Sequence, residues 1–277
     1  MVTTNRTSVI QRLRNIGIIS HIDAGKTTVT ERMLYYTGRT HKLGEVHDGE
    51  AVMDWMPQER ERGITIMAAA TTCSWRNHQI NLIDTPGHVD FAIEVERSLR
   101  VLDGAIAIFA AVEGVQPQSE SVWYQADRYH VPRLALVNKM DRLGADHHRV
   151  LQEMRDKLGA SPLLLQLPLG AEETFHGIID LVEMCSITWR DDDLGMTPDV
   201  GNIPPELQAQ AEAARETLID AVVEYDEALL EHYLAGEKLT PEQVRTAIRQ
   251  ATLAGTWVPV LLGSGLRNKG IQPLLDA

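Results

Sequence analysis

The chain alternates short apolar runs with segments whose apolar residues recur at helical spacing. The runs 16–19, 105–111, 134–137 and 258–262 contain no charged residue and predict buried strands. Helices are predicted for the segments 28–36, 91–102, 119–129, 145–158 and 270–275. Strands that are apolar throughout and alternate with helices indicate an α/β fold, a mostly parallel sheet with helices on both faces.

A hairpin and a long loop interrupt this alternation early in the chain. The β-compatible runs 67–75 and 79–83 flank the short polar turn 76–78, which predicts two antiparallel strands. The segment 39–65 before them is rich in charge and glycine. A loop of that length in a compact domain is usually functional or mobile.

A second unit is predicted from Ser161 to Thr256. It holds strand-like runs at 163–169 and 177–189, one long helix at 206–234, and a helix that begins after Thr240. It carries 18 acidic and five basic residues, whereas the 21 acidic and 21 basic residues elsewhere cancel. This change in charge predicts an inserted α+β subdomain. The expected domains are a first segment of the α/β unit at 1–160, the acidic insert at 161–256 and a closing segment of the α/β unit at 257–277.

The remaining composition fits an ordinary globular protein. Of the 277 residues, 44% are hydrophobic and 23% are charged. No run of about 18 apolar residues occurs, and the polar segment 1–14 lacks the core of a secretory signal. Cys73 and Cys185 lie far apart and show no metal-ligand spacing. We therefore expect a cytoplasmic protein without a disulfide.

A phosphate-binding loop is predicted between the first strand and the first helix. The sequence there is Ser20, His21, Ile22, Asp23, Ala24, Gly25, Lys26, Thr27 and Thr28. In such a loop, backbone N–H groups and the helix N-terminus face an anion, a lysine reaches the β- and γ-phosphates, and a hydroxyl ligates Mg²⁺. Ser20 stands where the general pattern has a first glycine. Taken alone, the match is also compatible with an ordinary strand–turn–helix and a surface lysine.

A second phosphate-proximal segment follows the strand at 79–83. Asp84, Thr85, Pro86 and Gly87 stand at the carboxyl end of that strand, the edge where α/β sheets bind ligands. Asp84 suits an outer-sphere role on Mg²⁺, and the Gly87 N–H can sense a γ-phosphate. Thr65, at the end of the long loop, is a candidate Mg²⁺ ligand while a γ-phosphate holds the loop closed. The metal candidates are thus Thr27, Thr65 and Asp84.

A guanine-reading segment is predicted after the strand at 134–137. It consists of Asn138, Lys139, Met140 and Asp141. The Asp141 carboxylate can accept two hydrogen bonds from the ring N–H and the exocyclic amine of guanine, which adenine cannot provide in that arrangement. A site built on such pairs discriminates by about 10⁴–10⁵. Ser264, Gly265 and Leu266 can supply backbone N–H groups to the guanine carbonyl, although many loops contain Ser-Gly.

Together these motifs resemble the translational GTPases, most closely the GTP-binding domain of bacterial elongation factor G. The likeness covers nearly the whole chain. It is carried by segments 21–28, 53–56, 59–66, 84–90, 138–141, 166–170 and 177–181. The resemblance implies a P-loop GTPase fold with an inserted subdomain, GTP or GDP with Mg²⁺ as ligands, and Thr65 as the threonine of the mobile loop.

His88 is the residue to which the resemblance gives a catalytic role. It follows Gly87, where Ras-like GTPases carry a glutamine that positions the attacking water. From spacing alone, an exposed histidine after a turn is an equal alternative. Pro57, Gly265 and Ala111 depart from what we expect of the family, without touching the phosphate chemistry.

The implied function is ribosome-stimulated GTP hydrolysis coupled to translocation. The implied partners are the ribosome, through its RNA and its stalk proteins; we expect a monomer that binds neither DNA nor membranes. A paralogous factor for recycling, ribosomal protection or peptide release, and a GTP/GDP switch with little hydrolysis, stay open as alternatives. The family's further domains would follow Ala277, so we read the chain as an N-terminal fragment.

Overall fold

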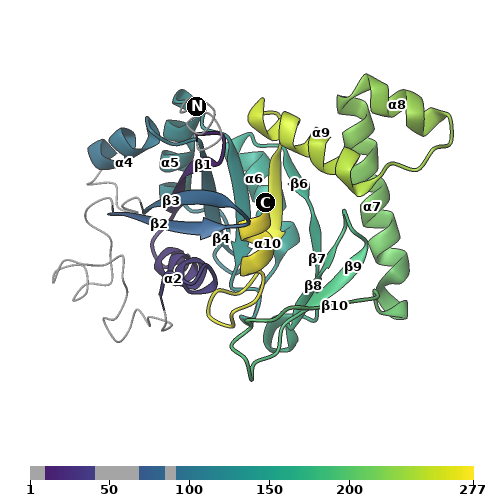
Figure 1. Cartoon of the computed structure of the whole chain (residues 1–277), viewed down its shortest axis with the longest axis horizontal. Helices are drawn as coiled ribbons and strands as arrows, with labels where there is room; N and C mark the ends of the chain where they lie inside the picture. Colours follow the sequence, from purple (N-terminus) through teal and green to yellow (C-terminus); the bar gives the residue numbers. More distant parts are fainter. Residues whose placement is uncertain (1–9, 41–68, 85–91) are drawn as a thin grey trace, which may run out of the picture.

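The computed structural model describes residues 10–40, 69–84 and 92–277. Its larger sheet has seven strands in the order β2-β3-β1-β4-β5-β11-β6 (Figure 1). Every pairing is parallel except that of β2 with β3. The strands are β1 (Leu13–Ser20), β2 (Ala69–Trp75), β3 (His78–Asp84), β4 (Gly104–Ala110), β5 (Arg133–Asn138), β6 (Pro162–Leu164) and β11 (Val258–Leu262).

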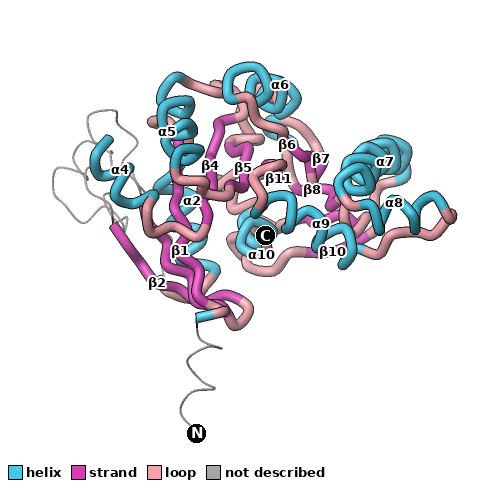
Figure 2. The backbone as a smooth tube through the Cα atoms, turned by 90° about the horizontal axis from the view of Figure 1, so that it is seen from above, coloured by secondary structure: helices cyan, strands magenta, loops and turns pink. Residues whose placement is uncertain are grey.

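Helices cover both faces of this sheet. The helices α2 (Lys26–Tyr36) and α10 (Ile271–Asp276) pack on one face, and α4 (Ala92–Leu99), α5 (Pro117–Arg128) and α6 (His147–Leu158) pack on the other. Figure 2 shows α5 and α6 across the strands from α10. Strand β4 shows why both faces are apolar: Ile106 and Ile108 join the α2 core, whereas Ala107 and Phe109 join the α5 core. The expected α/β fold with a mostly parallel sheet is confirmed.

The hairpin expected between β2 and β3 is present. Trp75 pairs with His78, so the turn contains only Arg76 and Asn77, whose φ angles are 40° and 66°. Two positive φ angles are typical of the type I′ turn, which matches the right-handed twist of the strands.

A second, antiparallel sheet has its own core. Its order is β10-β9-β8-β7, and helices pack on it at the right of Figure 1. The elements are β7 (Gln166–Leu169), the 3₁₀ helix η3 (Glu172–Thr174), β8 (Gly177–Asp180), β9 (Cys185–Thr188), β10 (Asp199–Gly201), α7 (Pro205–Tyr225), α8 (Glu227–Leu234) and α9 (Pro241–Leu253). As expected, Thr240 caps α9; Gln243 completes a capping box.

The single helix expected at 206–234 was wrong. The structure has two helices, because Asp226 leaves the helical region (φ −125°, ψ 107°) and its side chain accepts hydrogen bonds from the N–H groups of Ala228 and Leu229. Asp is a favoured N-cap residue, and here it starts α8 immediately after α7 ends. Glu227 and the residues after it therefore belong to α8, not to a continuation of α7.

Strand β6 is shared between the expected units. It lies in the range expected for the insert, yet it pairs with β11 at the edge of the large sheet. The domain limits 160/161 and 256/257 stay a prediction. Within the described ranges, no helix combines the length and the apolar character needed to cross a membrane.

Candidate functional site

The loop between β1 and α2 is a cradle of backbone groups. Asp23 and Gly25 have positive φ angles of 64° and 93°, and Gly25, the N-cap residue of α2, has no side chain with which to cap the helix. A Cβ added to Gly25 would lie 2.4 Å from the Nδ2 atom of Asn138, so only glycine fits there. Ser20, the residue in place of a glycine, donates from its Oγ to the carbonyl of His21 (2.9 Å). The loop thus presents helix N-terminal N–H groups toward the carboxyl edge of the sheet.

Lys26 and Asp84 meet at this edge. The Nζ atom of Lys26 lies 2.8 Å from Oδ1 of Asp84, and the two side chains are 9% and 0% exposed. Strands β1 and β3 are parallel neighbours with Ile18 opposite Asp84, so the loop that follows β1 starts beside the end of β3. Thr27 follows Lys26 and is half-buried. A hydroxyl and a carboxylate beside the phosphate loop are oxygen ligands of the kind that Mg²⁺ prefers.

Asn138 joins two loops of the candidate site. Its Nδ2 donates to the carbonyl of Ala24 (2.8 Å), and its Oδ1 accepts from the N–H of Gly265 (2.9 Å). The side chain is buried, with 2% of its surface exposed. One amide therefore holds the phosphate loop and the loop after β11 together.

Asp141 offers an unused acceptor in this region. Its side chain is 8% exposed, and the Nε atom of Arg267 lies 3.9 Å from Oδ2. Among the described residues, nothing donates a hydrogen bond to its buried Oδ1. A buried carboxylate oxygen without a donor is costly, and a ligand with N–H groups would satisfy it. The orphaned oxygen therefore fits the edge of guanine.

Lys139 and Met140 shape the turn before Asp141. Lys139 has a positive φ of 62°, and its Nζ lies 3.2 Å from Oε1 of Glu113. The N–H of buried Met140 donates to the carbonyl of Gly263 (3.2 Å), which ties this turn to the end of β11.

The loop that starts at Ser264 is closed on itself. Ser264 and Lys269 exchange two backbone hydrogen bonds of 2.9 and 3.0 Å. The Nε of buried Arg32 donates to the carbonyl of Gly265 (3.2 Å). A Cβ at Gly265 would approach Cγ2 of Val29 to 3.1 Å, so the loop packs closely on α2. Leu266 is half exposed.

Two residues that sequence reasoning missed support the phosphate loop from α5. Oε1 of Gln118 accepts from the N–H of Ile22 (3.1 Å), and Oγ of Ser119 lies 3.2 Å from Nδ1 of His21. Burial lowers the pKa of His21, which favours its neutral form. The sequence could have indicated them by their position, because both residues lie in the first turn of a helix that begins at the same carboxyl edge of the sheet.

Five predicted site residues lie outside the described part of the chain. They are Thr65, Thr85, Pro86, Gly87 and His88. The candidate water-positioning residue and one candidate metal ligand therefore stay predictions.

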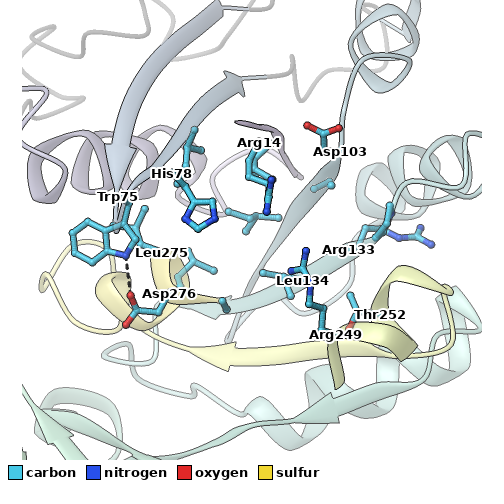
Figure 3. Close-up of a pocket in the computed structure, with 18 of the residues that line it drawn as sticks. Arg14, Trp75, His78, Asp103, Arg133, Leu134, Arg249, Thr252, Leu275 and Asp276 are labelled. Atoms are coloured by element: carbon cyan, nitrogen blue, oxygen red, sulfur yellow. Dashed lines mark hydrogen bonds between the residues drawn. The ribbon is translucent and has the colours of Figure 1, made fainter. Parts of the chain in front are cut away.

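A separate pocket of about 630 Å³ lies at the opposite, amino edge of the large sheet (Figure 3). Arg14, His78, Arg133 and Arg249 stand around an apolar base. At one side, Trp75 donates from Nε1 to Asp276 (2.8 Å). Its described lining includes no residue of the phosphate loop or of the segments 138–141 and 264–266.

Comparisons with known proteins agree with this geometry. The family described as elongation factor Tu GTP binding domain matches residues 11–277. Elongation factor G 2 of Geobacter metallireducens is 62% identical over 268 residues, or 97% of this chain and 39% of that protein. A crystal structure of a Thermus thermophilus protein superposes with a TM-score of 0.87 at 33% identity, covering 95% of this chain and 39% of that one.

The chain thus spans about two fifths of the length of these relatives. The family match covers nearly all of it, and the resemblance and the P-loop GTPase fold expected from the sequence are confirmed. The chain therefore belongs to the family of elongation factor Tu GTP binding domains, as a homologue of elongation factor G.

Proposed function

We propose that this chain binds GTP and GDP with Mg²⁺, hydrolyses GTP, and serves as the GTP-binding domain of an elongation factor G-like protein. In that protein, hydrolysis would be stimulated by the ribosome and coupled to translocation in the cytoplasm. The observation that carries the proposal is the buried, donor-free Oδ1 of Asp141 beside the Asn138 bridge. The 62% identity to elongation factor G 2 supports the assignment to translation.

The phosphate side of the proposed site consists of the loop 20–28. Its N–H groups and the N-terminus of α2 would bind the β-phosphate, and Lys26 would turn from Asp84 toward the β- and γ-phosphates. Thr27 would ligate Mg²⁺, with Asp84 in its outer shell. A bound Mg²⁺ would neutralise charge on the phosphate oxygens.

The guanine base would be recognised by the segment 138–141 and the loop 264–266, which hydrogen bonds connect to each other and to the phosphate loop. Oδ1 of Asp141 would accept from the base, and the N–H groups of 264–266 would donate to its carbonyl. Asn138 fixes the distance between this loop and the phosphate loop, because it bonds both. An adenine in the same place would leave the Asp141 carboxylate buried without a donor, which disfavours ATP.

Exchange of Asp141 for asparagine tests this reading. Wild type should prefer GTP to ATP by at least about 10³, a conservative share of the discrimination that polar pairing can give. Asp141→Asn should lose affinity for GTP and gain affinity for XTP, because the carbonyl of xanthine replaces the amine of guanine and accepts from the new amide. Equilibrium titration with ribose-labelled nucleotides measures both. Equal wild-type affinity for ATP and GTP would sink the proposal.

The partners of the proposed factor are the ribosome's RNA and a stalk protein. The charge of the acidic insert indicates which of these partners it would contact, because the phosphate backbone of RNA binds Lys and Arg and repels acidic residues. With a net charge of −13, the insert should dock on protein or face solvent. A solvated spacer that only aids solubility is the alternative.

A further inference from the structure

The loop between β9 and β10 connects the acidic insert to the candidate guanine loop. Figure 1 shows the segment before α10 lying between α2 and the near ends of β9 and β10. The loop, residues 189–198, is folded on itself: the N–H groups of Gly195 and Thr197 donate to the carboxylate of Asp193 (2.9 and 3.0 Å). We call it the insert loop.

Tyr36, the last residue of α2, bonds the insert loop directly. Its Oη lies 2.8 Å from the carbonyl of Leu194 and 3.3 Å from the carbonyl of Asn268. Burial raises the pKa of the Tyr36 hydroxyl far above its usual range, so the group keeps its proton and donates. One hydroxyl therefore lies between the insert and the loop that carries Ser264, Gly265 and Leu266.

Gln272 makes a second buried connection. Its Nε2 donates to the carbonyl of Gly195 (2.6 Å), and its Oε1 accepts from Nε1 of Trp189 (3.0 Å). Gln272 and Trp189 are 7% and 4% exposed. Lys269, also buried, lies 3.2 Å from Oδ1 of Asp191.

These contacts end on the residues that close the guanine loop. Lys269 exchanges its backbone hydrogen bonds with Ser264, and the N–H of Asn268 donates to the carbonyl of Gly265 (3.3 Å). A shift of Asn268 or Lys269 would therefore move the N–H groups of 264–266. Gly195 sets how close the two loops come: a Cβ there would lie 2.5 Å from the carbonyl oxygen of Asn268 and 2.9 Å from Oη of Tyr36.

We propose that Tyr36 and the insert loop are positioning elements for guanine, which hold the 264–266 N–H groups against the carbonyl of the base. The acidic insert thereby sets how fast the nucleotide leaves. This inference rests on the proposed GTP-binding function and deepens it, because it makes the insert part of the nucleotide site.

The first test removes one hydroxyl. Tyr36→Phe should speed the dissociation of ribose-labelled GDP from the 277-residue chain by about three- to tenfold, the factor expected from the net loss of one neutral hydrogen bond. Tyr124→Phe is the matched control, since its hydroxyl donates to the carbonyl of Lys157 at the same 2.8 Å but between α5 and the end of α6. The control should leave the dissociation rate within twofold of wild type.

A second readout separates positioning from general loosening. The sulfur of 6-thio-GDP replaces the base carbonyl oxygen and accepts hydrogen bonds poorly. If Tyr36 acts through the N–H groups of 264–266, Tyr36→Phe should weaken GDP by a clearly larger factor than 6-thio-GDP in competition titrations. Equal factors for the two nucleotides would mean that the hydroxyl only stabilises the fold, and would overturn the inference.

A pair of glycine variants tests the insert side. Gly195→Ala forces the insert loop away from Asn268, and it should accelerate GDP release at least as much as Tyr36→Phe. Gly236→Ala is the control, because Gly236 has a similar φ (80° against 69°) with no atom within 4 Å of an added Cβ. Both variants carry the same backbone strain, and only the first should change release.

The outcomes distinguish this inference from the proposed function. If wild type binds no guanine nucleotide, both fail. If wild type binds GDP, and Tyr36→Phe and Gly195→Ala release it at the rates of their controls, only the positioning role is overturned. Circular dichroism melts of all four variants show whether each one is folded at the assay temperature.

Discussion

Truncation of Asn138 to alanine should both destabilise the protein and weaken nucleotide binding. The side chain satisfies two main-chain groups at once, the carbonyl of Ala24 and the N–H of Gly265, and all three residues are buried. Leaving a buried polar group without its partner costs about 1–3 kcal/mol. Two such groups give about 2–6 kcal/mol, and water entering the vacated space should bring the measured loss to about 2–4 kcal/mol.

Nucleotide affinity should fall for a different reason than stability. Without the amide, the hydrogen bonds that join the loop after β11 to the phosphate loop are lost, so GDP would have to order these loops on binding. Ordering of this kind is subtracted from the binding free energy. We expect GDP affinity to drop by at least about tenfold, which corresponds to about 1.4 kcal/mol.

Two further variants assign the effect. Asn138→Asp keeps the acceptor for Gly265 but sets a carboxylate oxygen against the carbonyl of Ala24, so it should destabilise the protein by at least the loss of that one bond. Asn81→Ala is the control, because Asn81 donates from Nδ2 to Oδ1 of Asn15 (2.8 Å) on the far part of β3, in a partly exposed setting. Urea unfolding gives the stability and fluorescence titration gives the affinity. An Asn138→Ala protein within about 0.5 kcal/mol and twofold of wild type, thresholds well below the expected loss of about 2–4 kcal/mol, would refute the bridging argument.

Three other predictions address protonation, charge and catalysis. Burial lowers the pKa of His147 to about 4, below its value of about 6.5 in the unfolded chain. The unfolded state therefore binds a proton first as the pH falls, and the free energy of unfolding should decrease by up to ~3 kcal/mol between pH 6.5 and pH 4. His147→Phe should flatten that slope in urea titrations at stepped pH; identical slopes would contradict it. Reversal of the exposed residues Glu216, Asp220 and Glu224 to Lys in full-length protein should slow association with ribosomes and flatten its salt dependence, whereas rates unchanged at every salt concentration would favour a solvated spacer. His88→Ala should leave GTP affinity within a few-fold but abolish ribosome-stimulated turnover, which in GTPases can reach about 10⁵-fold; full stimulated turnover would rule out a water-positioning role.

The large sheet could be predicted from the sequence because most of its strands are recognisable from their own residues. Strands β4, β5 and β11 are nearly continuous apolar runs, which only a sheet covered on both faces requires. The loops that follow the strands carry polar residues at fixed spacing, so the phosphate and guanine segments could also be predicted from the sequence.

Other features depend on contacts that no local pattern records. Helical periodicity continues through Asp226, and the break between α7 and α8 arises when one side chain bonds the next turn. Strand β6 has three residues and takes its place only through pairing with β11, far along the chain. The supports from Gln118, Ser119 and Tyr36 likewise join segments that are distant in sequence.

Strand β11 follows the insert in the sequence and completes the large sheet. It lies between β5 and β6, and hydrogen bonds from Val258 to Ser161 and from Leu165 to Val260 show that the chain leaves for the insert and returns at one place. A compact insert brings these two points together and so reduces the entropy cost of closing the intervening loop. Synthesis proceeds from the amino end, so the edge of β5 that pairs with β11 stays unpaired until the insert has been synthesised. Each nascent chain therefore passes through a stage in which the phosphate loop exists and the base-specificity loop after β11 does not.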